Sequence, residues 1–405
     1  MEIVYRRCCG LDIHKASITA CVYINGKKEK LTYGTMTDDL LQMTAMLKER
    51  GIEMTAMEST GSFWKPIFNI LEVEGLAAIL VNAQHIKNVP GRKTDVKDAE
   101  WIADLLRHGL LKASFVKPRD QRELCELIRY RTSMIEERAR EYNRIGKVLE
   151  GANIKLTSVA SSIETASGMS MVKALSEGVV DADVLASMAQ GSMRSKIDEL
   201  KRAMNGLIRP HQQMMLRTML THIDELSKLI DLLDAEIAQR MHDDVELTEA
   251  LDEITGVGKV SAQTVIAEIG TNMDIFPSEH HLASWACICP GSNESAGKRK
   301  SGKTRKSNST LKKTLVQCGR TAGNSKKTYL GSLFRRIAAR RGAKRAAVAV
   351  GHTILIICYH MIKNRTKFKD LGSDFFQNRN KDALVRQNVK RLEALGFNVT
   401  LDVTV

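Results

Sequence analysis

The first 108 residues contain apolar segments in an order that few folds accommodate. Three strand-like segments come first, separated only by short polar breaks at His14–Lys15 and Gly26–Lys27. Two helix–strand pairs and a third helix follow. In chain order the predicted segments are Arg7–Ile13, Ser17–Ile24, Glu29–Met36, Asp38–Arg50, Glu53–Met57, Phe63–Glu74, Leu76–Val81 and Thr94–His108. The pattern therefore predicts a mixed α/β domain at the N-terminus.

This order matches, by analogy, the ribonuclease-H-like (RuvC-like) α/β fold. Four acidic residues lie at informative places within it. Asp12 in GLDIHK and Glu58 in AMESTG each end a strand-like segment. Asp95 and Asp98 are three residues apart, on one face of the third helix. Neighbouring strands would bring the first two together at one edge of the sheet, and the helix would place the other two over the same spot.

Carboxylates gathered in this way repel one another unless a cation lies between them. Divalent metal ions meet that need, and two-metal sites perform phosphoryl transfer. Each acid also has a purely structural interpretation: Asp95 and Asp98 would stabilise a helix dipole, and Glu58 would be a surface turn residue. All four on the expected elements of one fold favour a nuclease or a DNA strand-transfer enzyme.

The middle of the chain, residues 119–241, is mostly helical by pattern. Its clearest stretch has apolar residues in alternating steps of three and four, the seam of a coiled coil or a long helical hairpin. These residues are Leu216, Leu220, Ile223, Leu226, Ile230, Leu233 and Ile237. We expect a first arm over Arg119–Glu150, a cap over Gly151–Gly191 and a second arm after Pro210. A dimerisation surface or spacer and an intramolecular bundle are both open interpretations.

The net charge of the chain is +14, which indicates a polyanionic partner such as nucleic acid. The charge is uneven, because no acidic residue lies between Glu294 and Asp370 while lysines and arginines are frequent there. A solubilising face or a disordered tail is the alternative. Leu and Ala residues interleaved at helical spacing favour a folded binding surface.

A glycine-containing turn lies between two predicted helices in Leu251–Gly270. The sequence Gly256-Val257-Gly258-Lys259 resembles a helix-hairpin-helix element, in which backbone amides approach a phosphate. An ordinary corner with glycine caps is the alternative interpretation.

Ser295 lies in the loop GSNESAGKRKSGKTRKSNS, directly before the basic block. Lys298 and Arg299 could stabilise charge on a phosphate beside a serine nucleophile. On residue types alone, a polar loop that only contacts phosphate is the stronger interpretation. The nucleic-acid-binding candidates in this region are Gly256, Gly258, Lys259, Lys298, Arg299, Lys300, Lys303, Arg305, Lys306, Lys312 and Lys313.

The eight cysteines have no metal-ligand spacing and are expected to be reduced and buried, as in a cytosolic protein. We expect no membrane span, because Gly351 and His352 interrupt the apolar segment Ala346–Ile362. No signal peptide is expected.

The chain resembles the insertion-sequence 110 family of DEDD transposases. The resemblance rests on the four carboxylates, the segment ESTG with Phe63-Trp64-Lys65-Pro66, the KTDxxDA motif, the GVG segment, the loop SAGKRKSG and the stretch Asp370–Phe376. It implies that Asp12, Glu58, Asp95 and Asp98 hold metal and that Ser295 is the covalent nucleophile. The family's Ser-Ser-Gly-Gly-Lys is Glu294-Ser295-Ala296-Gly297-Lys298 here, so a carboxylate replaces the first serine.

The resemblance also implies a site-specific DNA recombinase of an insertion sequence, guided by a structured bridge RNA. We expect two Mg²⁺ ions about 4 Å apart, with Mn²⁺ as a substitute, donor and target DNA as substrates, and a dimer or tetramer. Because the nucleophile and the carboxylates are on different predicted domains, one subunit's serine could complete another's metal site. The expected location is the prokaryotic cytoplasm, at the nucleoid, with no membrane partner.

The expected domains are a RuvC-like domain (1–115), a helical coiled-coil region (116–245), an α-helical transposase domain with the helix-hairpin-helix-like element (246–345) and a C-terminal helical extension (346–405). The alternative function is a RuvC-like metal-dependent nuclease or Holliday-junction resolvase that uses water. A nucleic-acid-binding protein with a decayed site is a third hypothesis, and the four intact carboxylates argue against it.

Overall fold

The protein is described from a computed structural model. It describes residues 2–59, 61–82, 98–290, 293–295, 298–301, 304, 310–379 and 381–400. The chain forms two compact units, Met1–Arg119 and Asp120–Val405. The boundary between them lies close to the expected end of the first domain, whereas the finer division of the second unit stays a prediction.

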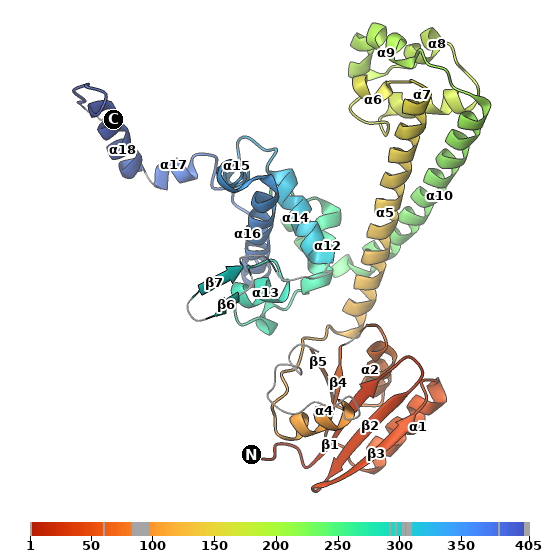
Figure 1. The fold of residues 1–405 in the computed structure, drawn as a ribbon, viewed down its shortest axis with the longest axis vertical. Helices are drawn as coiled ribbons and strands as arrows, with labels where there is room; N and C mark the ends of the chain where they lie inside the picture. Colours follow the sequence, from red (N-terminus) through yellow and green to blue (C-terminus); the bar gives the residue numbers. More distant parts are fainter. Residues whose placement is uncertain are drawn as a thin grey trace. The chain divides into compact units, whose positions relative to one another are not determined.

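The first unit is built on a mixed five-stranded sheet (Figure 1). Its strands lie in the order β3-β2-β1-β4-β5, with β1, β2 and β3 antiparallel and with β4 and β5 parallel to β1. The strands are β1 (Arg7–Ile13), β2 (Ile18–Ile24), β3 (Lys27–Tyr33), β4 (Met54–Glu58) and β5 (Ala78–Val81). Three antiparallel strands followed by parallel strands with helical crossovers are compatible with the expected ribonuclease-H-like domain.

Helices cover both faces of this sheet, because alternate strand residues are apolar on both sides. Helices α1 (Thr37–Glu49) and α2 (Trp64–Val73) pack on the face that contains Cys9, Leu11 and Met57. Helix α4 (Asp98–Arg107) packs on the opposite face. The strand and helix order predicted from the sequence is confirmed. Thr37, one residue before the predicted start of this helix, is the first residue of α1, with Met36 at the N-cap position.

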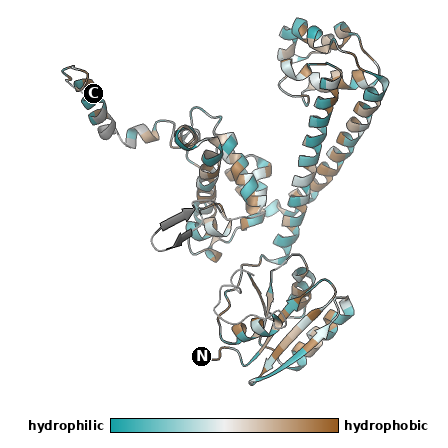
Figure 2. Cartoon of the chain, viewed as in Figure 1, coloured by the Kyte–Doolittle hydropathy of each residue, from teal (hydrophilic) through white to brown (hydrophobic). Residues whose placement is uncertain are grey.

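The second unit begins with two long helices that run side by side, α5 (Arg119–Gly151) and α10 (Pro210–Arg240) (Figure 1). The residues of the predicted seam are buried along α10 except Leu233, which is half-buried, and Leu226 and Ile230 pack against Met134 of α5. Figure 2 shows that much of α5 is hydrophilic, whereas α10 has more apolar residues. The seam therefore packs within the chain. A coiled coil between subunits stays a prediction.

A small helical cap joins the distal ends of α5 and α10. It consists of α6 (Leu156–Val159), α7 (Ala166–Ser176), α8 (Ala182–Ser187), the 3-10 helix Gly191–Lys196 and α9 (Ile197–Met204). The cap extends beyond the predicted end at Gly191, because Leu200 and Met204 of α9 are buried in the same core as Ile145 and Leu216 of the arms. Pro210 is the first residue of α10, where its missing N–H costs no hydrogen bond.

The proximal ends of the arms contact the following helices, α11 (Val245–Asp252) and α12 (Lys259–Ile269). Arg131 of α5 is 1% exposed, and its Nη1 donates to Asp234 of α10 at 2.6 Å and to Gln263 of α12 at 2.7 Å. Arg129 donates to both carboxylate oxygens of Glu268 on α12, at 2.8 and 2.9 Å. Polar contacts therefore join the two arms to α12.

Three further helices of the second unit pack against α16 (Ala343–Asn364): α13 (Glu279–Trp285), α14 (Thr310–Ala322) and α15 (Tyr329–Arg341). Helices α17 (Phe375–Arg379) and α18 (Lys381–Glu393) follow toward the C-terminus. A short hairpin of β6 (Asn293–Ser295) and β7 (Lys298–Ser301) precedes α14.

Gly351 and His352, which interrupt the apolar run of Ala346–Ile362 in the sequence, do not interrupt the helix, because α16 continues through both residues. A Cβ atom on Gly351 would lie 2.5 Å from the Leu315 carbonyl oxygen of α14, and one on Gly319 would lie 2.3 Å from the Ala347 carbonyl oxygen of α16. These glycines let two helix backbones cross closely, so they are packing residues and not helix breakers.

By length and composition, α16 would suffice to cross a membrane. However, 56% of its most apolar stretch is buried within the structure, as is common for the core helix of a globular unit. Its apolar residues therefore have an internal packing role.

Candidate functional site

Asp12 and Glu58 lie next to each other at the carboxyl ends of two parallel strands. The register of β1 on β4 pairs Leu11 with Met57, so the next residue on each strand is one of the two acids. Cys8 and Ala56 lie in the core under α4, and strand residues two apart point to the same side. Both carboxylates therefore project from the sheet face that α4 covers.

The first turn of α4 lies over the same end of β1. A Cβ atom on Gly10 would come within 2.4 Å of both the Ala103 nitrogen and the Ala99 carbonyl oxygen, so helix and strand are in close backbone contact there. At the other end of the helix, the Arg107 carbonyl accepts a hydrogen bond from the Val4 amide, at the residues before β1. The helix runs antiparallel to β1, which brings Asp98 toward the end that holds Asp12 and Glu58.

Glu100 fixes the start of α4 and was not identified from the sequence. Its carboxylate is 15% exposed and forms ion pairs with Lys28 and, at 3.2 Å, with Lys30, both on β3. The hydrogen bond from Lys28 holds the pKa of Glu100 below its ordinary value. Glu100 therefore stays charged and anchors the helix end that presents Asp98.

His14 is a second neighbour of the site that sequence patterns did not select. Its Nε2 lies 3.3 Å from Oδ2 of Asp12. The imidazole is largely exposed, whereas Asp12 is 28% exposed. The backbone amide of His14 donates a hydrogen bond to the Ser17 carbonyl at 2.9 Å, which holds His14 in the turn after β1.

The residues present suit a hard divalent cation. Carboxylate oxygens are the ligands that Mg²⁺ and Mn²⁺ prefer. Asp12, Glu58 and Asp98 come from three different elements to one end of the sheet, whereas Asp95 lies outside the described residues. Among the described residues, no group of three acidic, histidine or cysteine side chains lies close enough to hold one metal ion.

Ser295 is the last residue of β6, in the second compact unit. The hairpin register pairs Ser295 with Lys298 and Glu294 with Arg299. The strand pairing therefore brings two of the predicted phosphate-binding positions opposite the predicted nucleophile and its acidic neighbour. Lys303, Arg305 and Lys306 lie outside the described residues.

Residues before and after the hairpin contact one another. Pro290 pairs with Thr304 in an isolated bridge, and Lys312 at the start of α14 donates to the Thr304 hydroxyl at 2.9 Å. Lys313 is exposed. Lys312 therefore has a structural partner, and Lys313 is available to solvent.

The GVG turn between α11 and α12 is tightly seated. Gly256 has φ of 88°, and a Cβ atom there would lie 2.5 Å from the Cys318 carbonyl oxygen and 2.6 Å from the Ala322 nitrogen of α14. Gly258 and Lys259, at the start of α12, are exposed. The turn thus has one side packed on α14 and one side open. That it functions as a helix-hairpin-helix element stays a prediction.

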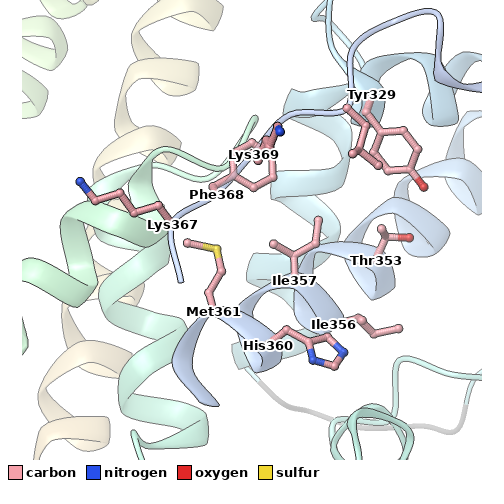
Figure 3. Close-up of a pocket in the computed structure, with 10 residues that line it drawn as sticks. Tyr329, Thr353, Ile356, Ile357, His360, Met361, Lys367, Phe368 and Lys369 are labelled. Carbon is pink, nitrogen blue, oxygen red and sulfur yellow. The ribbon is translucent and has the colours of Figure 1, made fainter. Parts of the chain in front are cut away.

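A largely apolar pocket lies between α15, α16 and the segment after α16 (Figure 3). Its volume is about 330 Å³, and it is lined by Tyr329, Thr353, Ile357, His360 and Phe368 among others. None of the residues predicted from the sequence to be functional lines it.

Comparison with known proteins identifies relatives of both units. Residues 9–154 match a family model of DEDD transposases of the IS110 type, described as a transposase. Residues 248–333 match the model described as "Transposase IS116/IS110/IS902 family". A protein of Pseudomonas aeruginosa named "Probable family 20 transposase" is 23% identical over 327 residues, which cover 78% of this chain and 86% of the relative.

Proposed function

The chain belongs to the insertion-sequence 110 family of transposases, and on that premise we propose that it is a site-specific recombinase that cuts and rejoins the DNA of its element under the guidance of a bridge RNA. The observation that best supports a catalytic role for the N-terminal unit is the pairing of β1 with β4. It brings Asp12 and Glu58 side by side, beneath the helix that begins at Asp98.

In this proposal Asp12, Glu58, Asp95 and Asp98 bind two divalent metal ions. The bound ions would polarise the scissile phosphate and lower the barrier to attack on phosphorus. The chain's part is to hold four oxygen donors at one sheet end. The ion pairs from Lys28 and Lys30 to Glu100 keep the first turn of α4 in place for that purpose.

Ser295 is the proposed nucleophile. Its hydroxyl oxygen forms a bond to phosphorus and loses its proton, while the bond from phosphorus to the leaving strand breaks and that strand's oxygen takes up a proton. The phosphoserine linkage conserves the phosphodiester bond energy, so a DNA hydroxyl can later displace the serine and rejoin the strands. The pairing of Ser295 with Lys298 supports this proposal, because it places a cationic residue opposite the nucleophile position.

The nucleic-acid surface is proposed to include the GVG turn, the hairpin of β6 and β7, and the start of α14. The positive charge of residues 298–369 and the exposed Gly258 and Lys259 support it. Recognition by base pairing with a guide RNA would remove the need for base-reading side chains. Since Ser295 and the carboxylates lie on separate compact units, we also propose a dimer or tetramer in which one subunit's serine serves another's metal site.

Charge-neutral variants of the carboxylates test the metal proposal. We expect Asp12→Asn and Glu58→Gln each to lower Mg²⁺-dependent DNA cleavage at least about a hundredfold, because each removes a charged metal ligand without changing side-chain volume. Cleavage would be measured on supercoiled donor DNA with the element's non-coding RNA. Asp38→Asn, an exposed acid in the first turn of α1, is the matched control and should keep full activity.

Retention of metal-dependent cleavage by both Asp12→Asn and Glu58→Gln would exclude this site. Metal titration by calorimetry gives an independent readout, since both variants should bind Mn²⁺ more weakly even where no DNA is present.

A further inference from the structure

Asp370 ends the long basic block and makes three contacts with different parts of the second unit. Its Oδ1 accepts hydrogen bonds from the Tyr329 amide at 3.0 Å and from the Gly372 amide at 2.7 Å. Its Oδ2 accepts a longer bond, of 3.4 Å, from the hydroxyl of Thr255. Thr255 directly precedes Gly256 in the GVG turn, and Tyr329 is the first residue of α15. One carboxylate therefore joins the GVG turn, the start of α15 and the C-terminal segment.

The contacts of the GVG turn and of Asp370 reach both ends of the turn between α14 and α15. Gly256 packs against the Ala322 nitrogen, where that turn begins, and Asp370 binds Tyr329, where it ends. Arg335 donates from within α15 to the Ser325 carbonyl at 2.7 Å and to the Lys326 carbonyl at 2.9 Å. The turn of residues 323–328 is thus held at both ends and in the middle.

Aromatic packing holds the segment that bears Asp370. Tyr329 stacks on Phe376 with ring centroids 5.3 Å apart, and the Arg336 guanidinium lies 5.0 Å from the centre of the same ring. Ser332 donates to the Ser373 carbonyl at 3.0 Å. The preceding residues Lys367, Phe368 and Lys369 line the same pocket as Tyr329 (Figure 3). Several contacts therefore fix the position of Asp370.

The electrostatic surroundings show that Asp370 is not an ion-pair partner. Lys326, Lys327, Lys367 and Lys369 are exposed, and within the described part of the chain none of them forms an ion pair. Among the described residues, the Asp370 carboxylate accepts hydrogen bonds from two amides and one hydroxyl and forms no ion pair. Its contribution to the structure therefore lies in the geometry of these hydrogen bonds.

We propose that Asp370 is a positioning residue that joins the GVG turn and the 323–328 turn into one surface for a phosphodiester backbone. The exposed Lys259, Lys326 and Lys327 would contact successive phosphates from this surface, held at fixed separations by the Asp370 contacts. The inference rests on the proposed nucleic-acid role of the GVG turn, and it adds a second turn and the residue that aligns the two.

The sign of the effect distinguishes positioning from simple electrostatics. Removing an acidic residue from a nucleic-acid-binding surface raises its positive charge, which by itself strengthens binding. We expect Asp370→Ala to weaken binding about tenfold instead. The slope of log K against log salt, which is negative, should become less steep by about one to two units, because phosphate contacts are lost. The probes are a mixed-sequence DNA duplex and, in a separate arm, the RNA of the element's non-coding end. A loss in either arm supports the proposal.

Asp374→Ala is the matched control. Asp374 is an exposed acid four residues away. Among the described residues, its side chain accepts a hydrogen bond from the adjacent Ser373 alone, at 3.0 Å. Its removal therefore changes the net charge as Asp370→Ala does, but leaves the contacts with Thr255 and Tyr329 intact. It should bind as tightly as the wild type or more tightly. Thr255→Val removes only the hydroxyl contact with the GVG turn and should weaken binding in the same direction with native thermal stability. It keeps the proposal testable if Asp370→Ala unfolds.

The positioning role of Asp370 and the nucleic-acid role of the GVG turn can be tested separately. If Lys259→Ala weakens binding but Thr255→Val and a folded Asp370→Ala bind as tightly as Asp374→Ala, the positioning role is wrong and the nucleic-acid role of the turn stands. If Lys259→Ala leaves both affinity and salt slope unchanged, the GVG turn is not a nucleic-acid contact, and both proposals are overturned.

Discussion

Gly10 determines how closely α4 approaches the carboxylates. It lies two residues before Asp12 on the same face of β1, and α4 contacts it through backbone atoms. A lone glycine within a strand is a known signal of close backbone approach, so the sequence contained this information, but it could not say which element would approach. The two nearest helix residues, Ala99 and Ala103, are small for the same reason.

We predict that Gly10→Ala destabilises the first unit by roughly 2–3 kcal/mol and removes DNA cleavage, because a Cβ atom 2.4 Å from two backbone atoms must displace α4. The measurement is urea unfolding followed by tryptophan fluorescence, with Trp101 on α4 as a reporter. Gly146→Ala on α5 is the control: its Cβ atom would meet only Ile163 at 3.5 Å, so the helix should gain up to about 1 kcal/mol. Equal stability of the two variants would contradict the packing described for α4.

The proposed site residues and the residues that position them differ in how far the sequence alone could support them. Asp12 and Glu58 follow from strand ends in a recognisable order, and the strand register bears out their proximity. Glu100 and Asp370 had no such signal, because a carboxylate that anchors a helix end or a turn resembles any other surface acid until its partners are placed. For Ser295, residue type favoured a simple phosphate contact, and only the family resemblance selected it as nucleophile.

At the scale of elements, the junction of α5, α10 and α12 depends on a buried guanidinium. Within the described residues, Nε and Nη2 of Arg131 have no hydrogen-bond partner, so Asp234 and Gln263 provide all of its compensation. A buried charge with incomplete partners is costly, and removing one partner costs more than replacing the whole group by apolar residues.

We therefore predict that Asp234→Ala lowers the free energy of unfolding by roughly 3 kcal/mol. The double variant Arg131→Met with Gln263→Leu should remain within about 1 kcal/mol of the wild type, because it removes the charge together with its buried amide partner. Chemical denaturation of the full chain would measure both. A double variant less stable than Asp234→Ala would show that the ion pair itself is strongly stabilising.

Element boundaries were predicted well where a local pattern determined them and poorly where packing did. The bounds of β1 and the buried seam of α10 follow from apolar periodicity and agree with the structure. The role of Gly351 could not be read from the sequence, because a glycine that permits a close crossing with α14 looks the same in sequence as one that ends a helix. The predicted cap was too short, because α9 also belongs to it: Leu200 and Met204 are buried in its core, which the local sequence pattern does not show.

At the scale of the whole molecule, the first family match runs from residue 9 through the first compact unit and α5, and the second covers residues 248–333 of the second unit. The helical cap, α10 and the residues after 333 lie outside both matches. The two compact units also differ in how far their basic residues are paired with acids. Basic residues of the first unit are often paired with acids, as in Lys48 with Glu74 and Arg50 with Glu29, whereas the acid-free stretch of the second unit has few such partners available. This asymmetry agrees with the proposal that nucleic acid neutralises the second unit and that the phosphate chemistry takes place at the acidic end of the first.

In the proposed mechanism, Ser295 bonds covalently to DNA with the help of the carboxylate site. The most direct test is to trap that bond by mixing the full chain with the element's RNA, supercoiled donor and target DNA and Mg²⁺, and identifying the DNA-linked peptide by mass spectrometry. We predict an adduct at Ser295 that requires Mg²⁺ and RNA and disappears in Ser295→Ala and Asp12→Asn. Cleaved DNA without an adduct, with cleavage retained in Ser295→Ala, would contradict it and identify a nuclease that uses water.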